Sequence, residues 1–126
     1  MYRPLSLLHV SQAFALVWAL ATPLAQAADA QHGSAVFKEE CSDCHSLTRN
    51  RKGPNLAGVV GRHCGSAPGY KYSDAMRARG VTWSPEQIDS YLTAPKKVVP
   101  GGKMKYDGLD DSQARADLIS FLATRS

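Results

Sequence analysis

The feature that most constrains this chain is the pentapeptide Cys41-Ser42-Asp43-Cys44-His45. Two thiols three positions apart in the last turn of a helix lie on one face, so both can add to the vinyl groups along one edge of a porphyrin. The next residue, His45, then lies below the ring centre and can offer a ring nitrogen to iron. The spacing predicts one haem c, attached covalently through Cys41 and Cys44, with its iron bound by His45.

Other uses of the cysteines fit less well. A thioredoxin-like redox pair needs a Cys-x-x-Cys beside a βαβ pattern, which this sequence lacks. A structural zinc site needs a second pair of ligands, whereas the candidates His32, His63 and Cys64 are scattered. A plain disulfide between the motif cysteines leaves His45 unexplained. Cys64 itself is expected to be a buried or half-buried small side chain, with a dimer-forming or reactive thiol as the alternative.

Residues 1–27 are typical of an export signal. Arg3 supplies a positive charge, residues 13–21 are mostly apolar, and Ala25-Gln26-Ala27 is a small-x-small cleavage site. The apolar stretch is too short to span a bilayer, although an uncleaved membrane anchor is the alternative. We therefore expect a cleavable signal peptide over 1–27, a periplasmic location, and a single domain over 28–126.

The periodicity of the remaining sequence predicts helices and no strands, which makes the fold class all-α. A first helix is expected over residues 30–40. The last helix is expected to open at Asp110 or Asp111 and to run close to the C-terminus. Its apolar stripe contains Leu118, Phe121 and Leu122.

Two shorter helices are expected between the first and the last. Ser73 should cap a helix that ends at Gly80. Ser84, followed by Pro85 in the first helical position, predicts the start of a second helix. Pro95 limits that helix, because proline has no backbone N–H for a helical hydrogen bond.

The second axial ligand is predicted to be Met104. The methionines that follow the signal peptide are Met76 and Met104. Met104 lies in a segment whose Pro100-Gly101-Gly102 run prevents a helix, and a loop can lay a thioether against a haem face. Met76 lies in a helical stretch and is expected to be a core or pocket side chain. His63 is the alternative ligand.

From Phe37 to Leu122 the sequence resembles the class I cytochromes c, most closely the mitochondrial cytochromes c and their bacterial periplasmic relatives. The matching stretches are CSDCH, KGPNLAGVVGR, APGYKYSDAMRARGVTW, YLTAPKKVVPGGKM and ARADLISFLATR. The resemblance implies about four to five helices wrapped around one covalent haem. It also implies that the first and last helices cross, with Gly33 allowing the close approach and with Phe37 and Phe121 helping to fill the crossing.

The resemblance also assigns residues to the pocket. Pro54 matches the proline whose carbonyl accepts a hydrogen bond from the proximal histidine, and Arg62 matches a residue that offsets propionate charge. Tyr72 and Trp83 match positions that hydrogen-bond a propionate, and Tyr91 matches a tyrosine near the methionine sulfur. The residues that match the lysine ring used for partner docking are Lys96, Lys97, Lys103 and Lys105.

The chain departs from the mitochondrial pattern in several places. Gly102 replaces a threonine, so the Met104 loop is expected to be looser. Met76 replaces an asparagine, which predicts a more apolar pocket. Glu40 stands where a docking lysine is usual, and Asp110 with Asp111 replaces part of another lysine cluster. The basic face is therefore expected to be incomplete.

The function expected from this resemblance is that of a mono-haem electron shuttle and not of an enzyme. The donor would be a cytochrome bc complex or a dehydrogenase, and the acceptor an oxidase, reductase or photosynthetic reaction centre, each with an acidic docking surface. Removing Arg3 from 15 Lys and Arg leaves 14 against 11 Asp and Glu, a net charge of +3, which argues against nucleic-acid binding. We expect a monomer. The alternatives are a fixed subunit of one complex and a gas sensor in which Met104 is displaceable.

Overall fold

The computed structural model describes residues 26–126, so nearly all of the predicted signal peptide lies outside the described residues. The elements are α1 (Ala30–Val36), the π-helix η1 (Phe37–Cys41), α2 (Asp74–Ala78), α3 (Pro85–Thr93), α4 (Pro95–Val98) and α5 (Ser112–Ala123). Within the described residues there is no strand, only an isolated bridge between His63 and Thr82. The predicted all-α class is confirmed. No helix in this part of the chain is long and apolar enough to cross a membrane.

Side-chain caps begin the helices where the sequence predicts them. The side chain of Ser73 accepts a hydrogen bond from the backbone N–H of Met76, and that of Ser84 accepts one from Gln87. The side chain of Asp111 accepts from two backbone N–H groups at the start of α5. These bonds satisfy donors that the first helical turn leaves free.

Two local features differ from the predictions. The first helix does not stay α-helical to residue 40, because its last turn is η1, in which the N–H of Ser42 donates to the carbonyl of Phe37 at 3.0 Å. Such wide turns occur mostly as single turns within α-helices, frequently at functional sites. Pro95 ends α3, but it also begins α4, which the sequence analysis did not predict. Proline suits both roles, because its fixed φ fits the first position of a helix.

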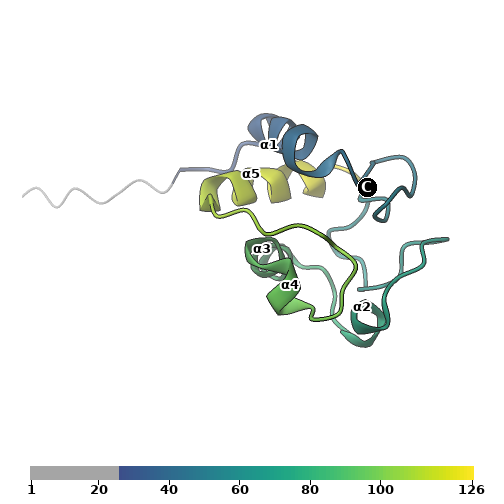
Figure 1. The fold of residues 1–126 in the computed structure, drawn as a ribbon. Coiled ribbons are helices and arrows are strands. Elements are labelled where there is room, and N and C mark those ends of the chain that lie inside the picture. Colours follow the sequence, from purple (N-terminus) through teal and green to yellow (C-terminus); the bar gives the residue numbers. More distant parts are fainter. Residues whose placement is uncertain (1–25) are drawn as a thin grey trace, which may run out of the picture.

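The first and last helices pack against each other, as predicted (Figure 1). Gly33 makes the approach possible, since a Cβ at this position would lie 1.9 Å from the backbone oxygen of Asp117. Next to it the rings of Phe37 and Phe121 lie 5.7 Å apart, and Leu118 is buried. This pair of helices is the rigid base that carries the Cys41–His45 motif.

The remaining elements lie below the α1–α5 pair in Figure 1. α3 and α4 follow each other closely, and α2 lies apart from them. The chain then returns from α4 to α5 through residues 101–111, which have no regular secondary structure. We call this segment the strap; in Figure 1 it rises between α4 and α2 and then runs between α3 and α5 to the start of α5.

Candidate functional site

One apolar cavity of about 470 Å³ lies at the centre of the fold. Cys41, Cys44 and His45 line it from the end of η1, and Met104 lines it from the strap. Much of the remaining wall is aliphatic: Leu56, Val59, Ile88, Leu92, Leu118 and Leu122. The folded chain therefore brings the two predicted axial ligands and the two predicted attachment thiols to the same space.

The motif is held by a tight backbone turn. The N–H of Cys44 and that of His45 both donate to the carbonyl of Cys41, at 3.1 and 2.9 Å. Both thiols are free, and burial raises the pKa of the Cys41 thiol to about 12. Neither thiol is paired in a disulfide, so both are available to add to a vinyl group.

His45 is oriented by the loop that follows the motif. Its Nδ1 lies 2.9 Å from the carbonyl oxygen of Pro54, and because a carbonyl only accepts, Nδ1 carries the proton. That tautomer leaves the lone pair of Nε2 free for a metal. Burial also lowers the pKa of His45, which favours the neutral ring.

Gly53 contributes to this side of the site, a role that the sequence analysis did not predict. A Cβ at Gly53 would lie 2.3 Å from Cε1 of His45, so the backbone packs directly on the imidazole ring. The N–H of Gly53 also donates to the carbonyl of Cys44 at 2.8 Å. A glycine beside the proline that bonds the histidine was the available signal.

Met104 reaches the cavity from the strap, half-buried and packed against the hydrophobic core. Met76 also lines the cavity, from α2, as expected for a pocket side chain. His63 is exposed and does not line the cavity. Of the candidates for the second ligand, the structure therefore brings the two methionines to the cavity and leaves the histidine outside it.

The other predicted pocket residues also line the cavity. Tyr72 accepts a hydrogen bond at its hydroxyl from the N–H of Ala67, at 3.0 Å. The rings of Trp83 and Tyr91 lie 5.0 Å apart, and burial raises the pKa of Tyr91 to about 12. Each of these aromatic side chains combines a large apolar body with one polar group.

Arg62 gives the strongest indication of a charged occupant. Its guanidinium donates to the carbonyl of Asn55 at 2.9 Å and to that of Ala57 at 3.2 Å, while its buried Nε has no partner among the described residues. A half-buried cation whose Nε is fully buried, in the wall of an otherwise apolar cavity, calls for an anion nearby. The residues present therefore fit a large, flat, apolar group that carries carboxylates and needs two thiols and an imidazole, as haem c does. In residues 26–126, no cluster of three or more His, Cys, Asp or Glu side chains could hold a metal ion by itself.

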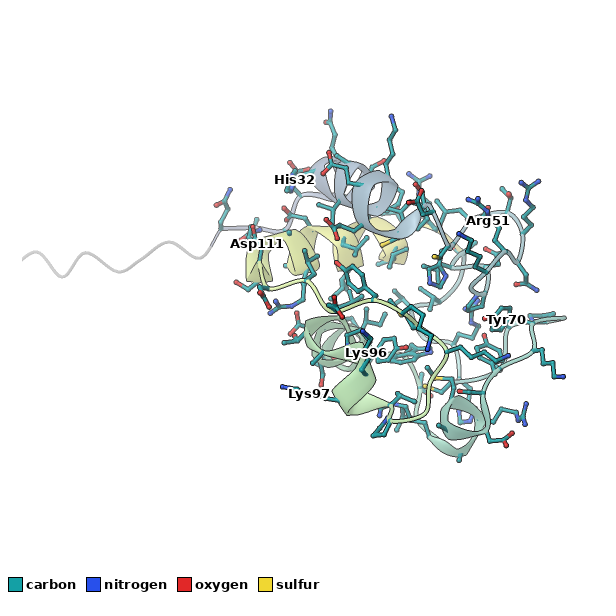
Figure 2. The ribbon with its side chains drawn as sticks, in the orientation of Figure 1. His32, Arg51, Tyr70, Lys96, Lys97 and Asp111 are labelled. Atoms are coloured by element: carbon teal, nitrogen blue, oxygen red, sulfur yellow. The ribbon has the colours of Figure 1, made fainter. Side chains whose placement is uncertain are left out.

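The predicted docking lysines are exposed, and they divide into two pairs. Lys103 and Lys105 border the cavity, as does Lys52, which was not predicted. Lys96 and Lys97 lie on α4 (Figure 2), and Lys96 is paired with Asp107 at 2.6 Å. The basic side chains at the cavity edge are thus those of the strap and of the loop before Gly53.

Two further features of the surroundings bear on the predictions. Cys64 is 2% exposed, which confirms that it is a buried small side chain, and burial raises the pKa of its thiol.

Tyr106 on the strap donates a hydrogen bond from its hydroxyl to Glu40 at 2.6 Å, and both residues line the cavity. Burial and the neighbouring carboxylate raise the pKa of Tyr106 well above its usual range. The sequence analysis missed this pair.

Comparisons with known proteins agree with this geometry. The cytochrome c family profile matches residues 30–126. Cytochrome c of Stellaria longipes is 45% identical over 97 residues, which cover 75% of this chain and 90% of the relative. Cytochrome c2 of Rhodomicrobium vannielii is 46% identical over 114 residues, which cover 88% of this chain and 89% of the relative. The structure of cytochrome cH from Methylobacterium extorquens matches with a TM-score of 0.74 at 41% identity, covering 77% of this chain and 99% of the other. On this evidence the chain belongs to the cytochrome c family.

Proposed function

We propose that this protein is a periplasmic electron shuttle in which His45 and Met104 bind the iron of one haem c. As a member of the cytochrome c family, it is a mono-haem electron carrier. The observation that carries the proposal is the apolar cavity that Cys41, Cys44, His45 and Met104 line together. The haem supplies an iron that accepts and releases one electron.

The chain's own residues would hold and insulate that iron. Cys41 and Cys44 would hold the haem through two thioether bonds, and the Pro54 carbonyl keeps His45 in the tautomer that can bind metal. Met104 supplies a thioether, a ligand that favours the reduced iron and raises the reduction potential. With His45 and Met104 both bound to the iron, small molecules would find no open site, which would suit electron transfer and disfavour catalysis.

The polar pocket residues would serve the haem carboxylates. Arg62, with its unpartnered Nε, offsets their negative charge, and Tyr72 and Trp83 offer hydrogen-bond donors beside them. Tyr91 would lie near the sulfur of Met104 from α3. The aliphatic wall excludes water, which keeps the electrostatic surroundings of the iron constant through each redox cycle.

The partners are redox proteins with acidic surfaces around their own redox centres. The donor would be a cytochrome bc complex or a periplasmic dehydrogenase, and the acceptor an oxidase, a reductase or a photosynthetic reaction centre. The chain would act as a monomer, exported by residues 1–27. The amino-terminal sequence of protein isolated from the periplasm tests this, and a start at Ala28 is the expected result.

The first experiment is an absorption spectrum of the ferric holoprotein. We expect the weak far-red band of methionine-ligated haem in the wild type and in Met76→Ala, and its loss in Met104→Ala. Met76→Ala is the matched control, because the same side chain is removed from the same cavity. Attached haem without the band, or a band that survives Met104→Ala, would overturn Met104 as the ligand. Rapid binding of carbon monoxide by the reduced wild type would favour the gas sensor.

A second experiment tests the shuttle and its docking face. The double variant Lys103→Glu/Lys105→Glu should slow electron exchange with an acidic redox partner and remove the dependence of the rate on salt. Lys38→Glu is the control, because Lys38 is exposed on η1 and does not line the cavity. Equal rates for all three proteins would overturn docking through the strap lysines. A partner that co-purifies in fixed ratio would favour the bound subunit over the shuttle.

A further inference from the structure

The strap has very few bonds to the part of the chain that precedes residue 71. Apart from one bond, every hydrogen bond and ion pair that the described residues show for it goes to residue 71 or later, and these partners include residues of α5. Its partners there are Lys71, Leu92, Lys96, Val99, Gln113, Ala114 and Arg115. The exception is the bond from the hydroxyl of Tyr106 to Oε2 of Glu40.

This bond joins the two segments that the proposed haem site depends on. Glu40 lies on η1 next to the attachment residue Cys41, and Tyr106 lies two positions after Met104. The oxygen–oxygen distance is 2.6 Å, the length of a bond in which the acceptor is ionised, and such bonds are stronger than neutral ones. Tyr106 is half-buried and lines the cavity, so its position is also restrained by packing.

We infer that Glu40 and Tyr106 form a latch that holds the strap against the attachment helix and so keeps Met104 in place. The inference rests on the proposed binding of iron by Met104. Both are positioning residues, because neither offers an atom to the iron. The latch also gives Glu40 a role other than partner docking: its carboxylate is bonded to the strap, although the side chain remains exposed.

The test is the rate at which an added ligand replaces Met104. Imidazole at saturating concentration is mixed with the ferric holoprotein at fixed pH, so that opening of the strap limits the rate. Tyr106→Phe removes the hydroxyl and keeps the ring. We expect it to raise the rate about tenfold, the lower end of what a hydrogen bond to a charged group supports, because Glu40 is exposed. Glu40→Gln should give a smaller rise, since an amide oxygen still accepts but carries no charge.

Two comparisons separate a latch from a general loss of stability. Glu39→Gln changes the neighbouring exposed acid on η1 and should leave the rate unchanged. The double variant Tyr106→Phe/Glu40→Gln should open no faster than Tyr106→Phe alone, because both changes remove one bond. A rate for Tyr106→Phe within a factor of about two of the wild type, or additive effects in the double variant, would overturn the latch.

Amide hydrogen exchange of residues 104–109 distinguishes this inference from the proposed function. If Tyr106→Phe speeds exchange there while the wild type lacks the far-red band, the latch stands and ligation by Met104 fails. If the band is present and exchange is unchanged in Tyr106→Phe, ligation stands and the latch is wrong.

Discussion

The two sides of the cavity are built by different means. On the side of His45, backbone groups close to it in sequence define its position: the ring packs on Gly53 and bonds to the carbonyl of Pro54. On the side of Met104, the strap has no regular secondary structure. It is secured largely by side chains, among them the Tyr106–Glu40 bond and an exposed ion pair between Lys96 and Asp107.

This difference teaches where the site is rigid and where it can open. Backbone contacts at short sequence separation form with the loop itself and leave little room for substitution. Each exposed side-chain hydrogen bond or ion pair contributes less to the free energy of folding, and it can break independently of the others. Equivalent substitutions on the two sides should therefore have unequal effects, with the larger ones on the side of His45.

The largest effect is expected from Gly53→Ala. The new methyl group would overlap the imidazole, since the Cβ position lies 2.3 Å from Cε1 of His45 and 2.6 Å from Nδ1. The ring must rotate or the loop must move, and either change disrupts the bond to Pro54. We expect little holoprotein, measured as covalent haem per polypeptide after purification. Normal haem attachment with a normal spectrum would show that this side is as adaptable as the strap.

The second-largest effect is expected in the α1–α5 helix pair, which carries the Cys41–His45 motif. Phe121→Ala should lower the free energy of unfolding by about 3–5 kcal/mol, because it empties a buried site against Phe37. Phe121→Leu is the matched control and should cost less than about 1.5 kcal/mol, since it keeps most of the volume. Denaturant unfolding of the holoproteins measures both. The far-red band should persist in the folded fraction, so its loss at unchanged stability would contradict a purely structural role.

The contrast between the two sides also explains what the sequence could predict. The motif, the caps at Ser73, Ser84 and Asp111 and the stripe of α5 all depend on residues within a turn or two, and the structure has them where they were expected. The crossing of α1 and α5 followed from the family resemblance, and Gly33 supports it. Local sequence patterns therefore predicted most of the secondary structure.

What the sequence analysis missed depends on distances that spacing does not encode. The Tyr106–Glu40 bond joins residues 66 positions apart, so neither residue alone indicates the pair. The contact of Gly53 with the ring of His45 requires the path of the whole loop. Likewise, α4 begins at Pro95, because proline can begin a helix as well as end one. Helix propensity alone does not distinguish these two roles of proline.

A smaller effect concerns an ion pair that fastens α1 to α5. Nδ1 of His32 lies 2.7 Å from Oδ2 of Asp117, and Figure 2 shows His32 and Asp111 at the same end of the helix pair. Asp117 raises the pKa of His32 above 6.5, helped by Asp29 and Asp111. The backbone N–H of Asp29 and the imidazole hold the pKa of Asp117 below 3.8, with a further bond from the side chain of Gln113.

The direction of the pH dependence follows from these shifts. The contribution of His32 is present below pH 6.5 and is lost as the pH rises through its raised pKa, while that of Asp117 is lost as the pH falls through its lowered pKa. Unfolding between about pH 5 and pH 8 should therefore show a decline in stability that His32→Gln removes. His63→Gln, which changes an exposed histidine outside this pair, should keep the decline. Parallel curves for His32→Gln and the wild type would mean that the pair does not fasten the helices.

The smallest effect is expected from Gly102→Ala, the counterpart of Gly53→Ala on the strap. Gly102 does not adopt a positive φ, and a Cβ there would lie 3.1 Å from the carbonyl oxygen of Val99, so a shift of a few tenths of an ångström accommodates it. The loss of unfolded-state freedom stabilises by about 0.4–1 kcal/mol, which offsets the tight contact. We expect the free energy of unfolding to change by less than about 1 kcal/mol and the far-red band to remain. Gly53→Ala and Gly102→Ala each add one methyl group in the segment next to a proposed iron ligand. Loss of the band in Gly102→Ala would therefore show that the strap is as rigid as the loop around His45.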